Sequence, residues 1–309
     1  MSGKQIETVK QLYRHWVANS NLSLEDRRDL VEGWKVLTSE PQAVDYLETD
    51  AGGVLAMWAI PKQLAADRVI LGLHGGGFVA GSMFTHRKLF GHLAKAVGAR
   101  ALILNYRRSP ESTHPGPVNE VVAAYAWLLA QGIEPEHIVF AGDSAGGGLS
   151  VTSQVLARQR RLPVPAGALL LSPWVDMEVN GQSWESNGGK EELFVNREMV
   201  QWLARAFLGP EGDPRDPLAN PLYANLSGLA PVYIQVGGDE VLLDDSRRLA
   251  KRLRNAGVEV KVDVFPEQQH TFQMAAGRAP EADAAIRKLA DWARPKLGLE
   301  ETDLRVANG

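Results

Sequence analysis

The stretch Gly142-Asp143-Ser144-Ala145-Gly146 follows a short apolar run at residues 137–141 and precedes residues 149–158, whose pattern predicts a helix. The spacing G-x-S-x-G between a buried strand and a helix is typical of a nucleophile elbow. A turn this abrupt predicts a strained backbone with positive φ at Ser144, and the two glycines leave room for the chain to fold back. With 30 glycines in the chain, an accidental match is not rare, so the assignment needs support from other segments.

A glycine run, His74-Gly75-Gly76-Gly77-Phe78, follows a second apolar run at residues 69–73. It lacks the Gly-Lys-Ser/Thr ending of a P-loop and does not fit the G-x-G-x-x-G fingerprint of a dinucleotide site. Glycines leave backbone N–H groups with nothing in front of them, which suits a loop that binds an oxyanion. The two stretches together predict acyl transfer through a serine ester.

Ser144 is a weak nucleophile until a base removes its proton, and histidine suits that role near neutral pH. Of the seven histidines, His270 has the most suitable context, because it follows a predicted strand at residues 258–265 and a loop at residues 266–269. In open α/β sheets, the crevice at the carboxyl ends of the strands holds the chemistry. We therefore predict His270 as the base.

The acid that orients the histidine is expected at the end of another strand. An apolar run at residues 231–236 ends at two glycines, and Asp239 comes next. Glu240, Asp244 and Asp245 are alternatives, but the last two fit better in the first turn of a basic helix, where acids suit the helix dipole. We predict Asp239 as the acid.

With the chain order Ser144, Asp239, His270, the sequence resembles the hormone-sensitive-lipase-like family of α/β-hydrolases, especially its bacterial esterases. The resemblance covers most of the chain, from Ala51 to Leu297. It also rests on three further motifs, which are Tyr106-Arg107-Arg108-Ser109-Pro110-Glu111, Leu171-Ser172-Pro173-Trp174 and Asn220-Pro221-Leu222.

The resemblance implies a role for each residue of the site. Ser144 is the implied nucleophile, His270 the general base and Asp239 its partner, while Gly76, Gly77 and Ala145 supply the N–H groups of the oxyanion hole. The chain departs from the family at Thr271, because family members often place glycine after the catalytic histidine. We expect this departure to change local packing rather than chemistry.

The implied function is that of a serine carboxylesterase, which hydrolyses short-to-medium-chain carboxylic esters through an acyl-enzyme. With Asp143 before the serine, the sequence also resembles ε-lactone hydrolases and N-acetyl or aryl-acetyl hydrolases, which keep the same triad. A non-catalytic ligand-binding protein on this fold is a remote alternative, since folds outlive activities. The intact set of nucleophile, base, acid and glycine loop argues against it.

Seven predicted strands alternate with helices, which predicts an α/β fold with a mostly parallel central sheet and helices on both faces. The resemblance implies the α/β-hydrolase fold, in a single domain that we expect to span residues 1–309. The strands are expected at residues 54–60, 68–73, 101–105, 137–141, 167–172, 231–236 and 258–265.

Two amphipathic segments stand outside this alternation, residues 5–18 and residues 197–208 with Asn196 as N-cap. Their apolar faces are equally consistent with completing the core. The resemblance favours a helical cap over the catalytic core, formed by residues from about 1–45 and 177–215.

Residues 181–192 are polar and glycine-rich, which predicts a loop that acts as a hinge of the cap. The apolar faces of the cap would then line a pocket for the substrate. The candidates for this pocket are Phe78, Trp16, Trp202 and Phe207.

The composition of the chain indicates which classes of binding partner to expect. A net charge of −4 predicts no strong attraction to nucleic acid or anionic membranes, and the absence of cysteine excludes disulfides and cysteine-ligated zinc. No apolar span of about 18 residues occurs, so integral membrane association is not expected. We expect a cytoplasmic enzyme that acts on a small-molecule ester or lactone, without metal or cofactor, and a homodimer would be unsurprising.

Overall fold

A computed structural model of the chain describes residues 4–19, 23–194 and 197–299. The described residues form an eight-stranded sheet in the order β1-β2-β4-β3-β5-β6-β7-β8. Strands β4 to β8 and β3 run parallel, while β1 and β2 are antiparallel to their neighbours. The strands are β1 (Val44–Asp50), β2 (Leu55–Pro61), β3 (Val69–Leu73), β4 (Arg100–Leu104), β5 (Ile138–Asp143), β6 (Gly167–Leu171), β7 (Val232–Gly237) and β8 (Val260–Phe265).

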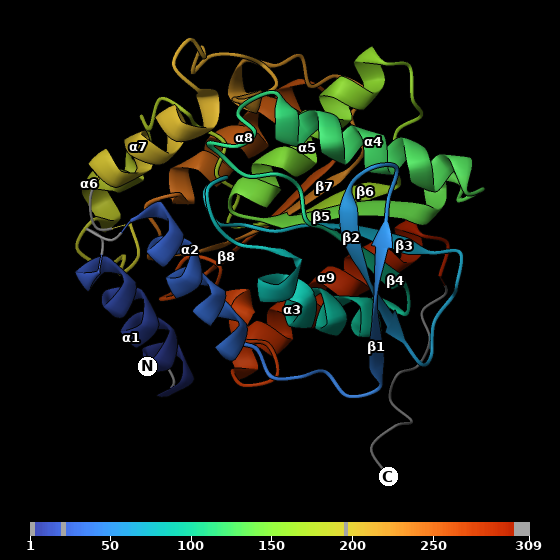
Figure 1. The fold of residues 1–309 in the computed structure, drawn as a ribbon, viewed down its shortest axis with the longest axis horizontal. Helices are drawn as coiled ribbons and strands as arrows, with labels where there is room; N and C mark the ends of the chain where they lie inside the picture. Colours follow the sequence, from blue (N-terminus) through green and yellow to red (C-terminus); the bar gives the residue numbers. More distant parts are fainter. Residues whose placement is uncertain (1–3, 20–22, 195–196, 300–309) are drawn as a thin grey trace.

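Helices cover both faces of the sheet. In Figure 1, α3 and α9 lie below the sheet, and α4, α5 and α8 lie above it. The helices are α1 (Lys4–Ala18), α2 (Leu24–Glu32), α3 (Met83–Val97), α4 (Gly116–Ala130), α5 (Ala145–Gln159), α6 (Ser183–Asn187), α7 (Arg197–Leu208), α8 (Leu243–Asn255) and α9 (Pro280–Lys296). This architecture confirms the predicted mostly parallel sheet with helices on both faces.

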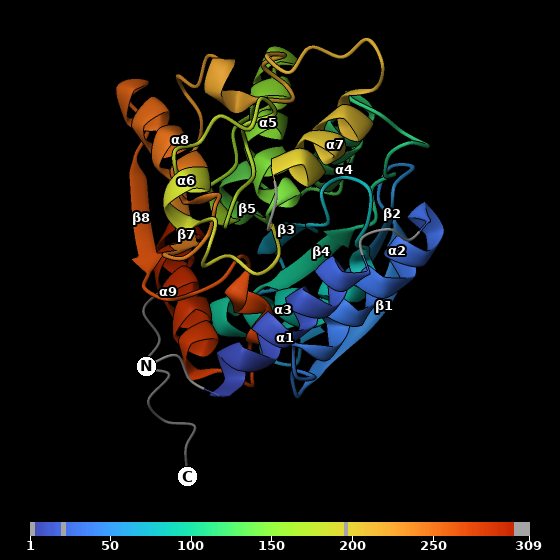
Figure 2. The same ribbon diagram turned by 90° about the vertical axis from the view of Figure 1, so that its left-hand side faces the viewer.

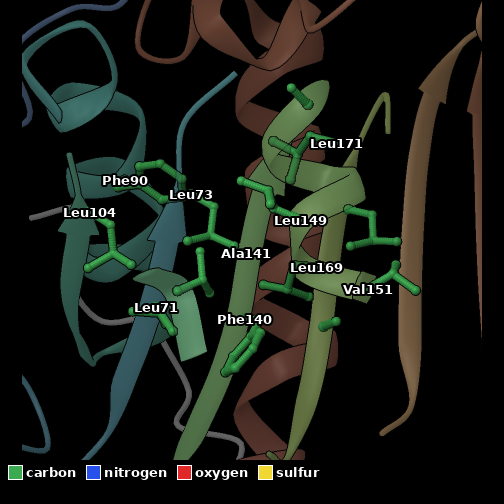
Figure 3. Packing of buried hydrophobic residues seen from close by; sticks show 14 of the residues in the cluster. Leu71, Leu73, Phe90, Leu104, Phe140, Ala141, Leu149, Val151, Leu169 and Leu171 are labelled. Atoms are coloured by element: carbon green, nitrogen blue, oxygen red, sulfur yellow. The ribbon is translucent and has the colours of Figure 1, made fainter. Parts of the chain in front are cut away.

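The core lies between the central strands and the helices that pack on them. Every residue of β3, β5, β6 and β7 is buried, as expected for parallel strands that are covered on both faces. Figure 3 shows the side chains of these strands packing with those of α3 and α5, among them Leu71, Phe90, Phe140 and Leu149. The apolar runs in the sequence predict these strands well because almost every side chain in them is buried.

All seven predicted strands are present, but β1 was not predicted. Its side chains are exposed or half-buried, and charged residues occupy several of its positions, so it carries neither an apolar run nor a clean alternation. β1 lies at the edge of the sheet, where charged side chains are common. The sequence therefore holds only a weak signal for it.

Four helices lie together on one side of the molecule. Figures 1 and 2 place α1, α2, α6 and α7 there, beyond the ends of the central strands. α6 lies within residues 181–192, so the prediction that this segment is entirely a loop is wrong. Asn196, the predicted N-cap of α7, lies outside the described residues. Within the described ranges, none of the helices has the length and apolarity needed to cross a membrane.

Candidate active site

Ser144 occupies the turn between β5 and α5. Its backbone has φ 51° and ψ −119°, which confirms the positive φ predicted for the centre of this turn. A side chain at Gly142 would clash with the carbonyl oxygen of Gly146, and one at Gly146 would clash with that of Leu73. The two glycines of the motif therefore allow the elbow to close tightly against the end of β3.

The glycine loop lies beside the elbow. Gly76 has φ 117° and Gly77 has φ 63°, conformations that side chains rarely tolerate. Among the described residues, the N–H groups of Gly76, Gly77 and Ala145 have no hydrogen-bond acceptor. Because Gly76 and Gly77 line the same pocket as Ser144, their free N–H groups are available to a ligand there.

Asp143 joins the two motifs. Its buried carboxylate accepts a hydrogen bond of 2.9 Å from the Gly75 N–H, and it also lies 3.2 Å from Nε2 of His86. A side chain at Gly75 would clash with this carboxylate. Asp143 therefore fixes the glycine loop relative to the elbow, a role that the sequence reasoning missed. The available signal was a carboxylate at the end of a buried apolar strand, which needs partners.

His74, at the start of the glycine run, is a packing residue. Its ring is fully buried and stacks on Tyr106 with 4.1 Å between the ring centroids. The Tyr106 hydroxyl donates a hydrogen bond of 2.7 Å to the His74 carbonyl. Burial, helped by the nearby His86, lowers the pKa of His74 to about 3, so its imidazole is neutral.

His270 presents one ring nitrogen to a carboxylate and keeps the other free. Nδ1 lies 2.9 Å from Oε2 of Glu240, and both side chains are completely buried. Among the described residues, no group forms a hydrogen bond with Nε2. His270 and Ser144 line the same pocket, as the sequence predicts for a base and its nucleophile.

The predicted acid, Asp239, is wrong by one residue, because the carboxylate on His270 belongs to Glu240. The chain turns back after β7, and Gly237 N–H and the Ser172 hydroxyl both donate to Oε1 of Glu240, at 2.5 and 2.6 Å. Asp239 is half-buried, and its N–H donates to the Gln268 carbonyl at 3.2 Å. The turn thus directs the second carboxylate, with its longer side chain, toward the imidazole.

Charges around His270 raise its pKa above the ordinary value. Burial favours the neutral ring, but the hydrogen bond and charge of Glu240, together with the charges of Glu191 and Asp143, outweigh burial. Glu191 is itself buried, and burial, with the charge of Glu240, raises its pKa to about 7. Oε1 of Glu191 accepts a hydrogen bond of 3.1 Å from the Leu193 N–H. The buried imidazole of His270 therefore lies among acidic side chains that favour its charged form.

One of the four predicted pocket residues lines the pocket. Trp16 contributes to its wall, together with Ser144. Phe78 and Phe207 are instead buried against each other, with stacked rings 3.6 Å apart. Trp202 is 38% exposed and lies under the guanidinium group of Arg27. The predicted apolar face of α7 is correct in part: Leu203 and Phe207 are buried, but Trp202 is exposed.

Several pocket residues were missed. They share an origin in the two segments that were predicted to form a cap, and most are apolar. They are Leu30, Val31, Trp34, Leu193 and Phe194, with Asn19 and Arg27 as polar members. Val17, Met199 and Leu203, which lie on the two apolar helical faces that were expected to line the pocket, do line it. Phe194 also contacts His270 edge-on, with 4.9 Å between the ring centroids. Met199 and Leu203 are four residues apart on α7, a spacing that marks one face of a helix.

The chain is similar to known hydrolases and esterases over nearly its whole length. A family model described as the alpha/beta hydrolase fold matches residues 70–274. An acetyl-hydrolase of Streptomyces hygroscopicus is 39% identical over 305 residues, covering 96% of this chain and 99% of the relative. Among solved structures, an esterase of the bacterial hormone-sensitive lipase family is 40% identical with a TM-score of 0.93, covering 96% of this chain and all of that chain. The structure of EstE5 soaked with p-nitrophenyl butyrate is 34% identical with a TM-score of 0.90, with the same coverage.

Proposed function

Because this chain belongs to the hormone-sensitive-lipase-like family of α/β-hydrolases, we propose that it is a serine carboxylesterase for short-to-medium-chain esters, with Ser144 as its nucleophile. The observation that carries the proposal is one pocket lined by Ser144, His270 and the glycine loop. The free Nε2 of His270 and the free N–H groups of the loop are the groups that acyl transfer needs.

In the proposed reaction, the Ser144 oxygen attacks the ester carbonyl and its proton passes to Nε2 of His270. The N–H groups of Gly76, Gly77 and Ala145 stabilise the oxyanion, and α5 directs its positive end at the same place. The carbon–oxygen bond to the alcohol then breaks, and the alcohol takes the proton from His270. Water repeats the two steps on the acyl-enzyme and releases the acid.

Glu240 takes the place that the sequence assigned to Asp239. Its contact with Nδ1 holds the imidazole in the tautomer that leaves Nε2 able to accept a proton, and it stabilises the imidazolium that forms. Ser172 and Gly237 in turn fix Glu240, so the carboxylate is held from three sides. This second set of contacts pre-organises the base.

The walls of the pocket support a small ester with an apolar acyl or alcohol part. We propose that residues 1–45 and 177–215 act as a cap, since both segments contribute side chains to the pocket. The cap is tied to the core through Arg28 of α2, which donates hydrogen bonds of 2.7 and 2.8 Å to the carbonyls of Val79 and Ser109. A cytoplasmic location and a homodimer remain predictions from the sequence.

A series of p-nitrophenyl esters tests the substrate class. We expect kcat/KM to be greatest between the acetate and the hexanoate and to be at least ~10-fold lower for the dodecanoate, because a long chain extends beyond the apolar walls of the pocket. Small lactones and N-acetyl amides measured in parallel separate the alternative activities. Opening of a lactone, or hydrolysis of an amide, far faster than any linear ester would contradict the proposal.

The acid limb of the kcat/KM profile tests the electrostatics of the base. His270 must be neutral to accept a proton, and Glu240 raises its pKa, so activity should fall as pH drops through a midpoint above the ordinary value of 6.5. In Glu240→Gln the raising effect is lost and burial remains, so the midpoint should move to lower pH. An unchanged midpoint in Glu240→Gln would show that another group controls the limb.

A further inference from the structure

Thr271, next to the catalytic histidine, has an unusual backbone. It is buried and has φ 50° and ψ 37°, in the left-handed region. A β-branched residue rarely adopts this conformation, and it is strained there. Surrounding contacts must therefore hold Thr271, and with it the main chain of His270.

Tyr13 of α1 supplies these contacts. Its hydroxyl donates a hydrogen bond of 2.8 Å to the carbonyl of His270 and lies 3.1 Å from Oγ1 of Thr271. Since its single proton goes to the His270 carbonyl, the hydroxyl accepts from Thr271. It also accepts a longer bond of 3.4 Å from Nε1 of Trp34. The buried hydroxyl of Tyr13 thus forms hydrogen bonds with both Thr271 and His270.

The same position is linked to the acid of the site. The Thr271 N–H donates to Oγ of Ser172 at 3.1 Å, and that hydroxyl donates to Glu240 at 2.6 Å. The strained residue is therefore a junction between α1 and the carboxylate that holds the imidazole. A displacement of Thr271 would move the main chain of His270, and it would also move the Glu240 carboxylate that contacts the His270 ring.

Tyr13 is also close to the substrate pocket. Trp16 lies one helical turn further along α1, lines the pocket, and packs against Tyr13 with 5.7 Å between ring centroids. Trp34, which donates to Tyr13, lines the pocket as well. Figures 1 and 2 show α1 and α2 next to each other on one side of the molecule. The packing of α1 and the position of His270 thus depend on the same side chains, those of Tyr13, Trp16 and Trp34.

We propose that Tyr13 is a positioning residue, whose hydroxyl holds Thr271 in its strained conformation and so couples the seating of α1 to the placement of the His270 imidazole. This inference rests on the proposed function for its kinetic consequences. It assigns a purpose to the one position at which the chain departs from the glycine expected after the catalytic histidine.

The test compares Tyr13→Phe, Thr271→Gly and the double variant. Tyr13→Phe should lower kcat about 10-fold and leave KM within about 3-fold, because the base is misplaced while the pocket is retained. Thr271→Gly alone should lower kcat by less than Tyr13→Phe does, since glycine adopts the left-handed conformation without strain and Tyr13 still holds His270. The double variant should recover most of the activity lost in Tyr13→Phe, because the strain that displaces the histidine is gone.

Tyr125→Phe is the matched control. The Tyr125 hydroxyl is also a buried donor to a carbonyl, that of Pro163 at 2.9 Å, but it lies on α4, away from the pocket. Thermal unfolding of all variants measures the general cost of losing such a bond. Equal losses of kcat in Tyr13→Phe and Tyr125→Phe, or a double variant no better than Tyr13→Phe, would overturn the proposal.

A second readout does not depend on activity. The proton between Nδ1 of His270 and Glu240 should give a low-field NMR resonance, which Tyr13→Phe should broaden or shift and Tyr125→Phe should leave unchanged. An unperturbed resonance in Tyr13→Phe would also overturn the positioning role. If the wild-type protein hydrolysed none of the esters, the proposed function would fail, and this resonance would still decide the role of Tyr13.

Discussion

Replacement of Ser144 by alanine is expected to lower kcat for ester hydrolysis by about 10⁴–10⁶-fold, because the hydroxyl that forms the acyl-enzyme in the proposed reaction is lost. His270→Ala should be similarly inactive. The double variant should be no worse than either single one, because the two residues act as a unit. The measurement is single-turnover hydrolysis of p-nitrophenyl butyrate, with labelling of Ser144 by a reactive phosphonate as an independent check.

A matched pair at the same position separates loss of chemistry from loss of structure. Ser144→Gly should be as inactive as Ser144→Ala but more stable by roughly 1 kcal/mol, because glycine relieves the strain of φ 51° at this position. For a domain of this size, the gain corresponds to about 2 °C in thermal unfolding. Substantial hydrolysis by either folded variant would reject Ser144 as the nucleophile.

The elbow and the glycine loop were predictable because their geometry is enforced locally. At Gly142 and Gly146, any side chain would clash with backbone atoms, so the presence of glycine itself indicates the tight turn. The same holds for Gly76, with its φ of 117°. Spacing and residue type alone thus locate the elbow and the glycine loop, while the buried strands follow from continuous apolar runs.

The pocket was predicted less well because the rotation of a helix about its own axis is a tertiary property. Phe207 and Leu203 both lie on the apolar side of α7, yet Phe207 stacks on Phe78 and Leu203 lines the pocket. Nothing in the local sequence separates these outcomes, since both residues are buried. The choice depends on the aromatic partner that the glycine loop presents to α7.

The acid was missed for a related reason. After β7 the chain carries two successive carboxylates, Asp239 and Glu240, and either one follows the strand end closely enough to reach a histidine. The choice is made by the hydrogen bonds from Gly237 and Ser172, which curl the turn so that Glu240 faces inward. Ser172 comes from the end of β6, so this information is distant in the sequence.

These two carboxylates provide the sharpest test of the triad, because they are adjacent acids in one turn. Glu240→Gln is expected to lower kcat by about 10²–10⁴-fold, since an amide cannot stabilise the imidazolium and favours the wrong tautomer. Asp239→Asn should change kcat by less than about 3-fold, because the contact of this residue is made through its main chain. Both changes remove one negative charge, so a general electrostatic effect would act on both.

The contribution of Glu240 to kcat also depends on the groups that form hydrogen bonds with its carboxylate. Ser172→Ala removes a hydrogen bond of 2.6 Å to the carboxylate without touching His270, so kcat should fall by less than in Glu240→Gln, by about 10-fold. Glu240→Asp keeps the charge but shortens the side chain, which should place its effect between those of Glu240→Gln and the wild type. If instead Asp239→Asn were the more damaging change, the carboxylate on His270 during turnover would be that of Asp239, and the turn after β7 would have to rearrange when substrate binds.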